Sequence, residues 1–292
     1  MRTLVTFLFL FTCVQLSALP GQKRALVICV SEQEDKSWAA INASNDLYYV
    51  DKLLESSGYD DICVLTGKNA TKQGIIDAFV SLTNRCRQGD IVYIHFSGHG
   101  QLMTDVNGDE AAIRSKDRYD ECWIPYDAYL EYGENDKGDK HLSDDEIGSL
   151  LTGIKKMIGA TGRILVVVDA CHSGGSTRSH GKDLYEDLTV RGIEDVFTIP
   201  HTTHRLTESF SEDWLTLSAC MAHQVNAECV SPKVGKLTYI LYLLRSQLDK
   251  LTNKELLELI GKMMNSAEYK APLPQDPMLT GCTDEYEINV FF

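Results

Sequence analysis

The sequence lacks the pattern of a zinc site. Its nine cysteines include no C-x-x-C pair, and none has a histidine at the spacing that metal ligands need. After the first residues there is no second long apolar segment, so we expect no membrane span in the rest of the chain. No internal repeat is visible either. These absences point to a globular protein without structural zinc.

Positive charge is also scarce. The chain has 28 Lys and Arg against 42 Asp and Glu, a formal net charge of −14. Because an acidic surface repels phosphate groups, we expect neither nucleic acid nor an anionic membrane surface as the main partner. The same balance is compatible with a site for cationic substrates. With 292 residues and 43% hydrophobic content, the chain is long and apolar enough for one large domain.

Residues 1–18 have the pattern of a secretory signal peptide. Arg2 supplies the basic start, an apolar run follows, and Ala18 is the small residue at the expected cleavage site. We therefore expect export to a periplasmic or extracellular location, where disulfides are permitted. A lipid anchor at Cys13 is the less favoured alternative, because the two residues before it fit a lipoprotein motif poorly.

Apolar strands alternate with helical segments along the chain. The patterns predict strands at 23–30, 61–66, 89–97, 163–169, 213–218 and 285–292, and helices at 37–57, 71–85, 142–156, 236–248 and 253–265. This alternation indicates a parallel sheet covered on both faces, with reactive groups at the carboxyl ends of the strands. The stretches 100–138 and 172–212 read as long irregular loops, which are usually functional or disordered.

Two predicted strands end on residues suited to nucleophilic catalysis. "YIHFSGHGQ" runs into His99, and "GRILVVVDACHSGG" runs into Cys171. If the strands are neighbours, imidazole and thiol meet at one edge of the sheet, where the imidazole can take the thiol proton. The backbone amides of Gly100 and Cys171 could then stabilise an oxyanion. The alternative, two side chains that only fill the core, is less favoured because both lie at strand ends beside glycines.

These two motifs, in this order, resemble the caspase-like cysteine peptidases of clan CD, most closely the metacaspases. Four further stretches are similar to that family: "YDECWIPYDA" at 119–128, "LSDDEI" at 142–147, "WLTLSACMAHQVNAE" at 214–228 and "GKLTYILYLL" at 235–244. The resemblance covers residues 23–292. It implies an α/β fold, the caspase-like three-layer sandwich, with an about six-stranded, mostly parallel sheet and helices on both faces.

The resemblance also implies a division of the chain and roles for two residues. Residues 23–292 would form the peptidase domain, with a large-subunit-like part (23–171), a linker loop (172–213) and a small-subunit-like part (214–292). His99 would be the general base and Cys171 the nucleophile of a cysteine endopeptidase. The family requires no organic cofactor for this chemistry.

A preference for basic residues follows from the same resemblance. The acidic primary pocket of metacaspases matches Asp46, Ser97 and Asp169 here, although the Cys that precedes the first of these in the family is Ala43 in this chain. Carboxylates that face one pocket hold a guanidinium by charge-assisted hydrogen bonds. We therefore expect protein or peptide substrates with Arg or Lys before the scissile bond.

The linker loop contains residues that such an enzyme would itself accept. Arg178, Lys182 and Arg191 are candidate sites of self-processing, because the corresponding linker is often cut when caspase-like zymogens are activated. The alternative is a flexible loop that stays uncut.

Calcium is a further expectation from the family. Asp144 and Asp145 match an acidic pair that binds calcium in many metacaspases, and carboxylates suit this hard cation. A third expected Asp is missing, since that position is Arg178. Acidic residues at the start of a helix are equally explained by the helix dipole.

Two other classes of protein remain open. A clostripain-like or gingipain-like peptidase would share the fold, the dyad and the basic preference, but the 119–128 segment argues against it. A non-catalytic caspase homologue would act as a binding module, and such proteins usually lose the His or the Cys. Both residues are present here.

Overall fold

The computed structural model describes residues 21–105, 119–171, 188–193, 195–200, 212–221, 224–266, 268–269 and 274–292. The predicted signal peptide (1–18) and the candidate residues Cys13, Arg178 and Lys182 lie outside the described residues. Export, lipid anchoring and processing at those two sites therefore stay predictions.

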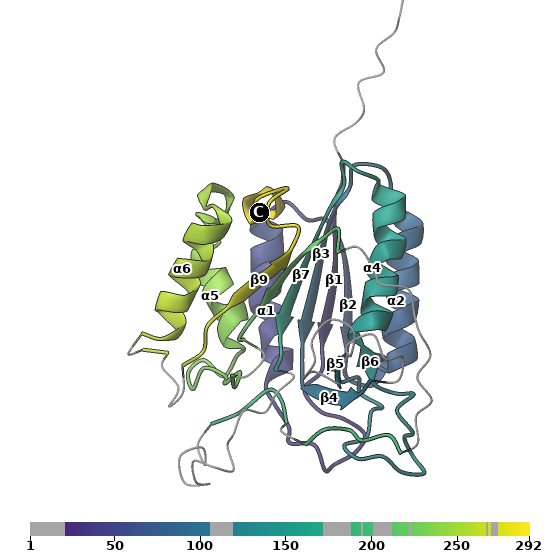
Figure 1. Cartoon of the computed structure of the whole chain (residues 1–292). Helices are drawn as coiled ribbons and strands as arrows, with labels where there is room; N and C mark the ends of the chain where they lie inside the picture. The colour runs from purple at the N-terminus through teal and green to yellow at the C-terminus, as the bar shows by residue number, and fades with distance from the viewer. Residues whose placement is uncertain are drawn as a thin grey trace, which may run out of the picture.

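A six-stranded sheet with the order β2-β1-β3-β7-β8-β9 forms the centre of the molecule (Figure 1). Its strands are β1 (Lys23–Cys29), β2 (Asp61–Thr66), β3 (Ile91–Ser97), β7 (Arg163–Asp169), β8 (Leu215–Ser218) and β9 (Met278–Gly281). Neighbours from β2 to β8 are parallel, and β9 pairs with β8 in the antiparallel direction. The predicted mostly parallel sheet is confirmed.

Helices cover both faces of this sheet, as Figure 1 shows. One face carries α1 (Ala43–Ser56), α5 (Lys236–Leu244) and α6 (Asn253–Met264), and the other carries α2 (Lys72–Arg85) and α4 (Asp144–Ile158). Short 3-10 turns occur at η1 (Gly67–Asn69), η4 (Leu248–Lys250) and η5 (Ile288–Phe291). Alternate side chains of β1 enter the two cores, with Val27 in one and Leu26 in the other. The sheet is therefore the middle layer of a three-layer sandwich.

Local sequence signals explain where two helices begin. The Ser143 hydroxyl accepts a hydrogen bond from the Glu146 amide at 3.4 Å, and the Glu146 carboxylate accepts one from the Ser143 amide at 3.1 Å. This capping box confirms the predicted start of α4. Thr71 caps α2 through its hydroxyl, which accepts from the Gly74 amide at 3.1 Å.

The helix predicted at 37–57 begins only at Ala43. The residues before it pass along the carboxyl edge of the sheet, where Trp38 is buried against the His99 ring, with ring centroids 5.1 Å apart. The backbone carbonyl of Ala39 is also bonded to the His99 ring. Tertiary contacts therefore override a local helical pattern that reads correctly only from Ala43 onward.

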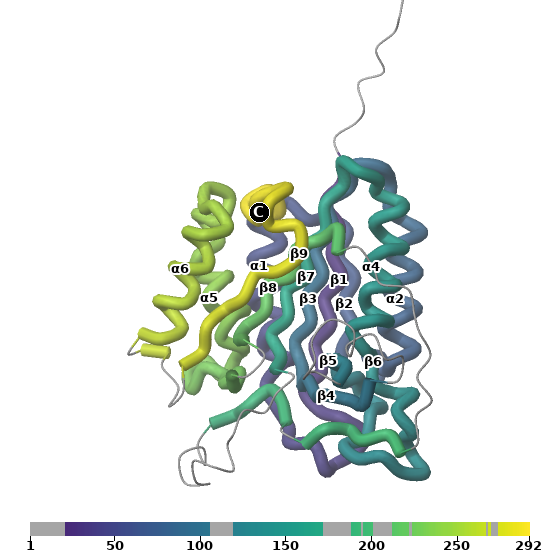
Figure 2. Tube along the Cα trace, in the orientation of Figure 1, coloured from purple at the N-terminus to yellow at the C-terminus, as the bar shows by residue number. Residues whose placement is uncertain are grey.

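The strand predicted at 285–292 is wrong. Half of that segment forms η5, in which Ile288 and Phe291, three residues apart, are both buried in the core under α5 and α6. The closing strand is β9, for which the sequence analysis made no prediction. In the tube view of Figure 2, β9 runs along β8 at the edge of the sheet.

The stretch 100–138 is more regular than predicted. It contains β4 (Gly100–Thr104) and β5 (Tyr119–Trp123), which join β6 (Leu142–Ser143) in a small antiparallel sheet of order β4-β5-β6. In Figure 1 this second sheet lies beyond the carboxyl ends of the central strands. It therefore belongs to the edge where the catalytic residues are expected.

The described residues contain no helix that is both long and apolar enough to cross a membrane. No two cysteines of the described residues form a disulfide; these cysteines are Cys29, Cys63, Cys86, Cys122, Cys171, Cys220, Cys229 and Cys282. The structure thus offers several buried thiols besides the predicted nucleophile.

Candidate active site

The predicted dyad lies at the ends of two paired strands. Strands β3 and β7 are parallel neighbours, and their register pairs Ser97 with Asp169. His99 follows the first of these residues by two positions, and Cys171 follows the second by two positions. The sheet register alone therefore brings both candidate catalytic residues to the same level of the same edge.

The environment of His99 defines which ring nitrogen is available for chemistry. The side chain is 2% exposed, and Nε2 lies 2.8 Å from the carbonyl oxygen of Ala39, so Nε2 carries the proton and donates. Within the described residues, buried Nδ1 has no hydrogen-bond partner. Burial lowers the pKa of His99 to about 4, against a raising effect of the Ala39 bond. At neutral pH the ring is therefore uncharged, with Nδ1 ready to accept a proton.

The Cys171 thiol is held at the end of β7. Its sulfur donates to the backbone carbonyl of Gln224 at 2.8 Å, and the residue is 1% exposed. Its backbone amide donates to the carbonyl oxygen of Arg191 at 2.7 Å. An amide at the nucleophile that binds a carbonyl oxygen is the arrangement expected of one half of an oxyanion hole.

Four polar side chains form a buried pocket beside Cys171. Asp46 lies in the first turn of α1, Ser97 ends β3, Asp169 ends β7, and Glu228 comes from the segment before α5. None is more than 4% exposed. The three residues predicted for the substrate pocket are therefore together, and they are joined by a carboxylate that the sequence analysis did not identify.

Backbone and hydroxyl donors fix the carboxylates of the pocket. Asp169 accepts from the Asn226 side-chain amide at 2.9 Å and from both the amide and the hydroxyl of Thr238 at 2.9 and 2.7 Å. Asp46 accepts from the Gly235 amide at 2.9 Å. Because buried charges are costly unless they are paired and hydrogen-bonded, these donors are what allows an acidic pocket to exist.

The pocket is occupied by a side chain of the protein itself, that of Arg191. Its Nη1 lies 2.7 Å from Asp46 and 2.6 Å from the Ser97 hydroxyl, and 3.5 Å from Asp169. Its Nε and Nη2 both lie 2.9 Å from Glu228. The guanidinium is completely buried, so every carboxylate of the pocket faces one cation.

The charges of this cluster reinforce one another. Although burial alone would lower the pKa of Arg191, the carboxylates of Asp46, Asp169 and Glu228 raise it. Burial would raise the pKa of Asp169, but the guanidinium and its hydrogen-bond donors hold it below its usual range. The pocket is therefore stable in its fully ionised form only with a cation inside.

The segment that carries Arg191 lies in the pocket as an added strand. Val190 pairs with Ala227 in an antiparallel bridge, and the Arg191 amide donates to the Asn226 carbonyl at 2.9 Å. One step earlier, the carbonyl of Thr189 accepts from the Glu228 amide at 2.9 Å. Main-chain pairing of this kind is a common way for enzymes to hold an extended peptide.

The bond after Arg191 lies against the nucleophile. A Cβ atom added to Gly192 would lie 2.3 Å from the carbonyl oxygen of Cys171 and 3.0 Å from its Cβ, so only glycine fits here without a shift. A cavity of about 350 Å³ adjoins this point, lined by Trp38, His99 and the residues around Gly192. The cavity gives room on the far side of the bond for the chain that follows it.

The remaining predicted residues are only partly tested. Gly100 begins β4 directly after His99, and its part in an oxyanion hole stays a prediction. Asp144 and Asp145 lie in the first turn of α4. In the part of the chain that the structure describes, no group of three or more His, Cys, Asp or Glu side chains could hold a metal ion, and calcium binding stays a prediction.

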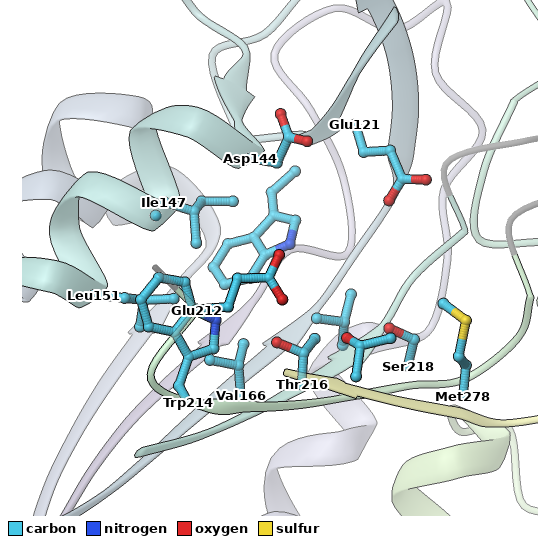
Figure 3. A pocket seen from close by; sticks show the side chains of 14 residues that line it. Glu121, Asp144, Ile147, Leu151, Val166, Glu212, Trp214, Thr216, Ser218 and Met278 are labelled. Carbon is cyan, nitrogen blue, oxygen red and sulfur yellow. The ribbon is translucent and has the colours of Figure 1, made fainter. Parts of the chain in front are cut away.

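A second hollow lies apart from the dyad, between α4 and the β7-β8 part of the sheet. Figure 3 shows Trp214 and Leu151 on its wall and the carboxylates of Glu121, Asp144 and Glu212 around it. Its volume is about 210 Å³. Neither His99 nor Cys171 lines it, so the candidate chemistry belongs to the Arg191 pocket.

Several residues of the site escaped the sequence analysis. They are Ala39, Gln224, Asn226, Glu228, Gly235 and Thr238. Five of them lie in two quoted stretches, "QVNAE" and "GKLT", which were identified only as similar to the family. The carbonyl of Ala39 carries no side-chain signal at all, so only the fold could reveal it.

The comparisons with known proteins agree with this geometry. A family model described as the caspase domain matches residues 22–283. The chain belongs to the caspase family. As a caspase-family member it is a cysteine endopeptidase of the caspase-like clan CD, most similar to the metacaspases. Both the predicted family and the predicted enzyme class are confirmed.

Three metacaspases illustrate the similarity. Metacaspase-1 of Mycosarcoma maydis is 23% identical over 301 residues, which cover 88% of this chain and 70% of that protein. Metacaspase-2 of Arabidopsis thaliana is 31% identical over 164 residues, 53% of this chain and 35% of its own length. Metacaspase-1 of Yarrowia lipolytica is 32% identical over 169 residues, 55% of this chain and 33% of its own length. The caspase-family chain thus spans about a third of the latter two relatives.

Solved structures share the caspase fold. A protein of Geobacter sulfurreducens matches with a TM-score of 0.62 and 22% identity, covering 89% of this chain and 92% of that one. Caspase-1 of Spodoptera frugiperda matches with a TM-score of 0.57 and 13% identity, covering 89% and 86%. The predicted caspase-like sandwich is therefore confirmed.

Proposed function

We propose that this caspase-family peptidase cleaves after basic residues with a His99–Cys171 dyad, and that it first cleaves its own chain between Arg191 and Gly192. The observation that carries the proposal is the position of Arg191. Its guanidinium fills the acidic pocket, and its carbonyl oxygen accepts from the Cys171 amide at 2.7 Å. The segment is thus bound as a substrate would be.

The proposed chemistry follows from the atoms that face the bond. The Cys171 sulfur attacks the carbonyl carbon of Arg191 while Nδ1 of His99 takes the thiol proton. The negative oxygen that forms is stabilised by the Cys171 amide, and His99 returns the proton to the departing amine of Gly192. Water then hydrolyses the thioester, which releases the new carboxyl group at Arg191 and restores the thiol.

The uncut chain would be a zymogen under this proposal. As long as Arg191 is covalently continuous with Gly192, its side chain excludes an external Arg or Lys from the pocket. Because the segment is tethered beside the thiol, the first cleavage would be intramolecular. Its first-order rate constant would not depend on protein concentration.

Self-cleavage is tested by incubating purified protein and sequencing new amino termini. From the unsubstituted protein we expect a fragment that begins at Gly192, formed with a rate constant that is the same at every protein concentration. From Cys171→Ala we expect no such fragment. Arg191→Gln should stop cleavage at this bond, whereas Arg178→Gln and Lys182→Gln serve as matched controls that retain it. A fragment in the Cys171→Ala sample would instead indicate a contaminating protease.

The dyad and the basic preference are tested with short peptides in trans. Cys171→Ala should abolish hydrolysis, and His99→Ala should lower it by about a thousandfold or more at neutral pH. Peptides with Arg or Lys before the scissile bond should be cleaved, and those with Asp should not, because a carboxylate cannot enter a pocket of buried carboxylates. Near-normal turnover in either variant, or a preference for Asp, would contradict the proposal.

A further inference from the structure

One carboxylate of the pocket, that of Glu228, contacts a guanidinium nitrogen that lysine lacks. The guanidinium of Arg191 meets Asp46 end-on, with Nη1 and Nη2 at 2.7 and 3.1 Å from its two oxygens. Glu228 instead meets the side edge of the guanidinium, where Nε and Nη2 both lie 2.9 Å from its Oε1. Nε exists in arginine but not in lysine.

Hydrogen bonds from Asn42 also fix the Glu228 carboxylate in position, so it cannot move toward a lysine ammonium bound in the pocket. Asn42 donates from its backbone amide to Oε1 at 2.9 Å and from its side chain to Oε2 at 2.6 Å. Glu228 is 4% exposed, so water does not replace a missing partner. A lysine ammonium bound at Asp46 would place apolar methylene groups along Glu228 and leave a buried charge without its cation.

We infer that Glu228 makes this peptidase selective for arginine over lysine, an inference that rests on the proposed function. A site built to bond a substrate N–H rejects an analogue that lacks it, because the buried acceptor is left unpaired. The broader expectation of Arg or Lys is thereby narrowed to Arg. Glu228 acts as a specificity-determining residue and takes no part in the bond-breaking steps.

Peptide hydrolysis gives the first test. For the processed protein we expect kcat/KM to be at least about a hundredfold higher for an Arg peptide than for the same peptide with Lys. In Glu228→Gln this ratio should fall by about tenfold or more, mainly through loss of Arg turnover. Glu258→Gln is the matched control, because Glu258 is an exposed acid on α6, paired with Lys254. Equal turnover of both peptides by the unsubstituted protein would overturn the inference while leaving the proposed function intact.

A second test does not need catalysis. In the inactive Cys171→Ala protein, Arg191→Lys should lower the melting temperature, and it should lower it by less than half as much when Glu228→Gln is also present. Such a cycle measures the coupling of the two side chains. An equal effect in both backgrounds would overturn the inference, even if no peptide were hydrolysed by the active protein.

An independent observation concerns a second thiol beside the nucleophile. Strand β8 pairs with β7 so that Ser218 is level with Val168, and Cys220 follows β8 by two residues, as Cys171 follows β7. Both sulfurs lie near the same backbone oxygen, that of Gln224, at 2.8 Å from Cys171 and 3.5 Å from Cys220.

The two thiols also interact directly. A hydrogen bond to Cys171 raises the pKa of Cys220, and burial raises it further. Cys220 is 6% exposed and no other role in the proposed reaction falls to it. A thiol that shares a hydrogen-bond acceptor with a nucleophilic cysteine is well placed to react with its oxidised form.

We propose that Cys171 and Cys220 form a reversible disulfide that switches the peptidase off. A peroxide would oxidise the Cys171 thiolate to a sulfenic acid and be reduced to water. The Cys220 sulfur would then attack that sulfur, displace a second water and close the S–S bond. A dithiol reductant would restore both thiols and take up the oxidising equivalents.

Hydrogen peroxide treatment of the processed protein tests this pair. We expect loss of peptidase activity that dithiothreitol restores almost completely, together with a disulfide-linked peptide containing Cys171 and Cys220 in the mass spectrum. Cys220→Ser and Cys220→Ala should instead be inactivated irreversibly, because the sulfenic acid is oxidised further. Cys63→Ser is the control and should behave as the unsubstituted protein. Irreversible inactivation of the unsubstituted protein, without the linked peptide, would overturn the proposal.

Discussion

Two groups of acidic residues in this protein differ in how the chain assembles them. Asp46, Asp169 and Glu228 come from distant parts of the sequence, are buried and share one guanidinium. Asp144 and Asp145 are adjacent in sequence at the start of α4, where the first is exposed and the second half-buried. The comparison teaches that acids clustered in a sequence need not form the binding site, whereas acids far apart in it can.

The reason lies in what surrounds each carboxylate. In the pocket, backbone amides and hydroxyls such as those of Gly235 and Thr238 hold the carboxylates around the guanidinium. At the helix start, the macrodipole and a capping box already account for acidic residues.

The largest effect is expected from Asp46→Asn. The change keeps the shape of the side chain and removes the charge that binds the guanidinium end-on. Breaking one partner of a buried ion pair costs about 3–5 kcal/mol, so kcat/KM for Arg peptides should fall by about two to four orders of magnitude. Alkylation of Cys171 by iodoacetamide should be largely retained in this variant. This control distinguishes a loss of substrate binding from a loss of thiol reactivity. A variant with more than a tenth of normal turnover would contradict the role of Asp46.

Acid should weaken the fold around the pocket by several kcal/mol. Burial lowers the pKa of both His95 and His99 to about 4, below the 6.5 of the unfolded chain. The unfolded state therefore binds more protons in this range. The stability contributed is fully present above about pH 6.5 and is lost as the pH falls toward about 4.

Urea unfolding at pH 7 and at pH 5 measures this effect. The free energy of unfolding should be lower at pH 5, and His95→Gln should remove part of the difference. No pH dependence beyond that of surface carboxylates would show that neither histidine is buried as described.

A smaller loss is expected from Ser97→Ala. The hydroxyl accepts from Arg191 at 2.6 Å and donates to Asp46 at 2.5 Å, so the variant loses hydrogen bonds but keeps every charge of the pocket. Hydrogen bonds to charged groups contribute about 1.5–3 kcal/mol, so Arg turnover should fall by about ten- to a hundredfold. The fall should be clearly smaller than for Asp46→Asn in parallel assays, and the opposite order would invert the roles assigned here.

The smallest effect is expected at the start of α4. Asp144→Asn and Asp145→Asn remove charges that favour the helix dipole, so each should lower the free energy of unfolding by about 0.3–1 kcal/mol. Melting temperatures should be compared with and without added calcium. A calcium-dependent stabilisation that disappears in both variants would instead support the family-based expectation of a calcium site.

The dyad could be predicted from the sequence because it depends on strand ends. His99 and Cys171 each follow a continuous apolar strand, and parallel strands place their carboxyl ends at one edge whatever their order. The helix predicted at 37–57 begins six residues later than expected, and the segment 285–292 contains a 3-10 turn where a strand was predicted. In both, contacts across the fold outweighed a weak local preference, as with Trp38 against His99.

The family, the layered α/β architecture and the two residues proposed for the chemistry could all be predicted from the amino-acid sequence, since they depend on local periodicity and short motifs. It took the folded structure to show that Arg191, one of three candidates in the linker, lies in the pocket and that Glu228 faces its Nε. It also placed the sulfurs of Cys171 and Cys220 near one backbone oxygen, that of Gln224. The physical reason is that each of these contacts joins residues far apart in the chain, where no local pattern records which side chains will meet.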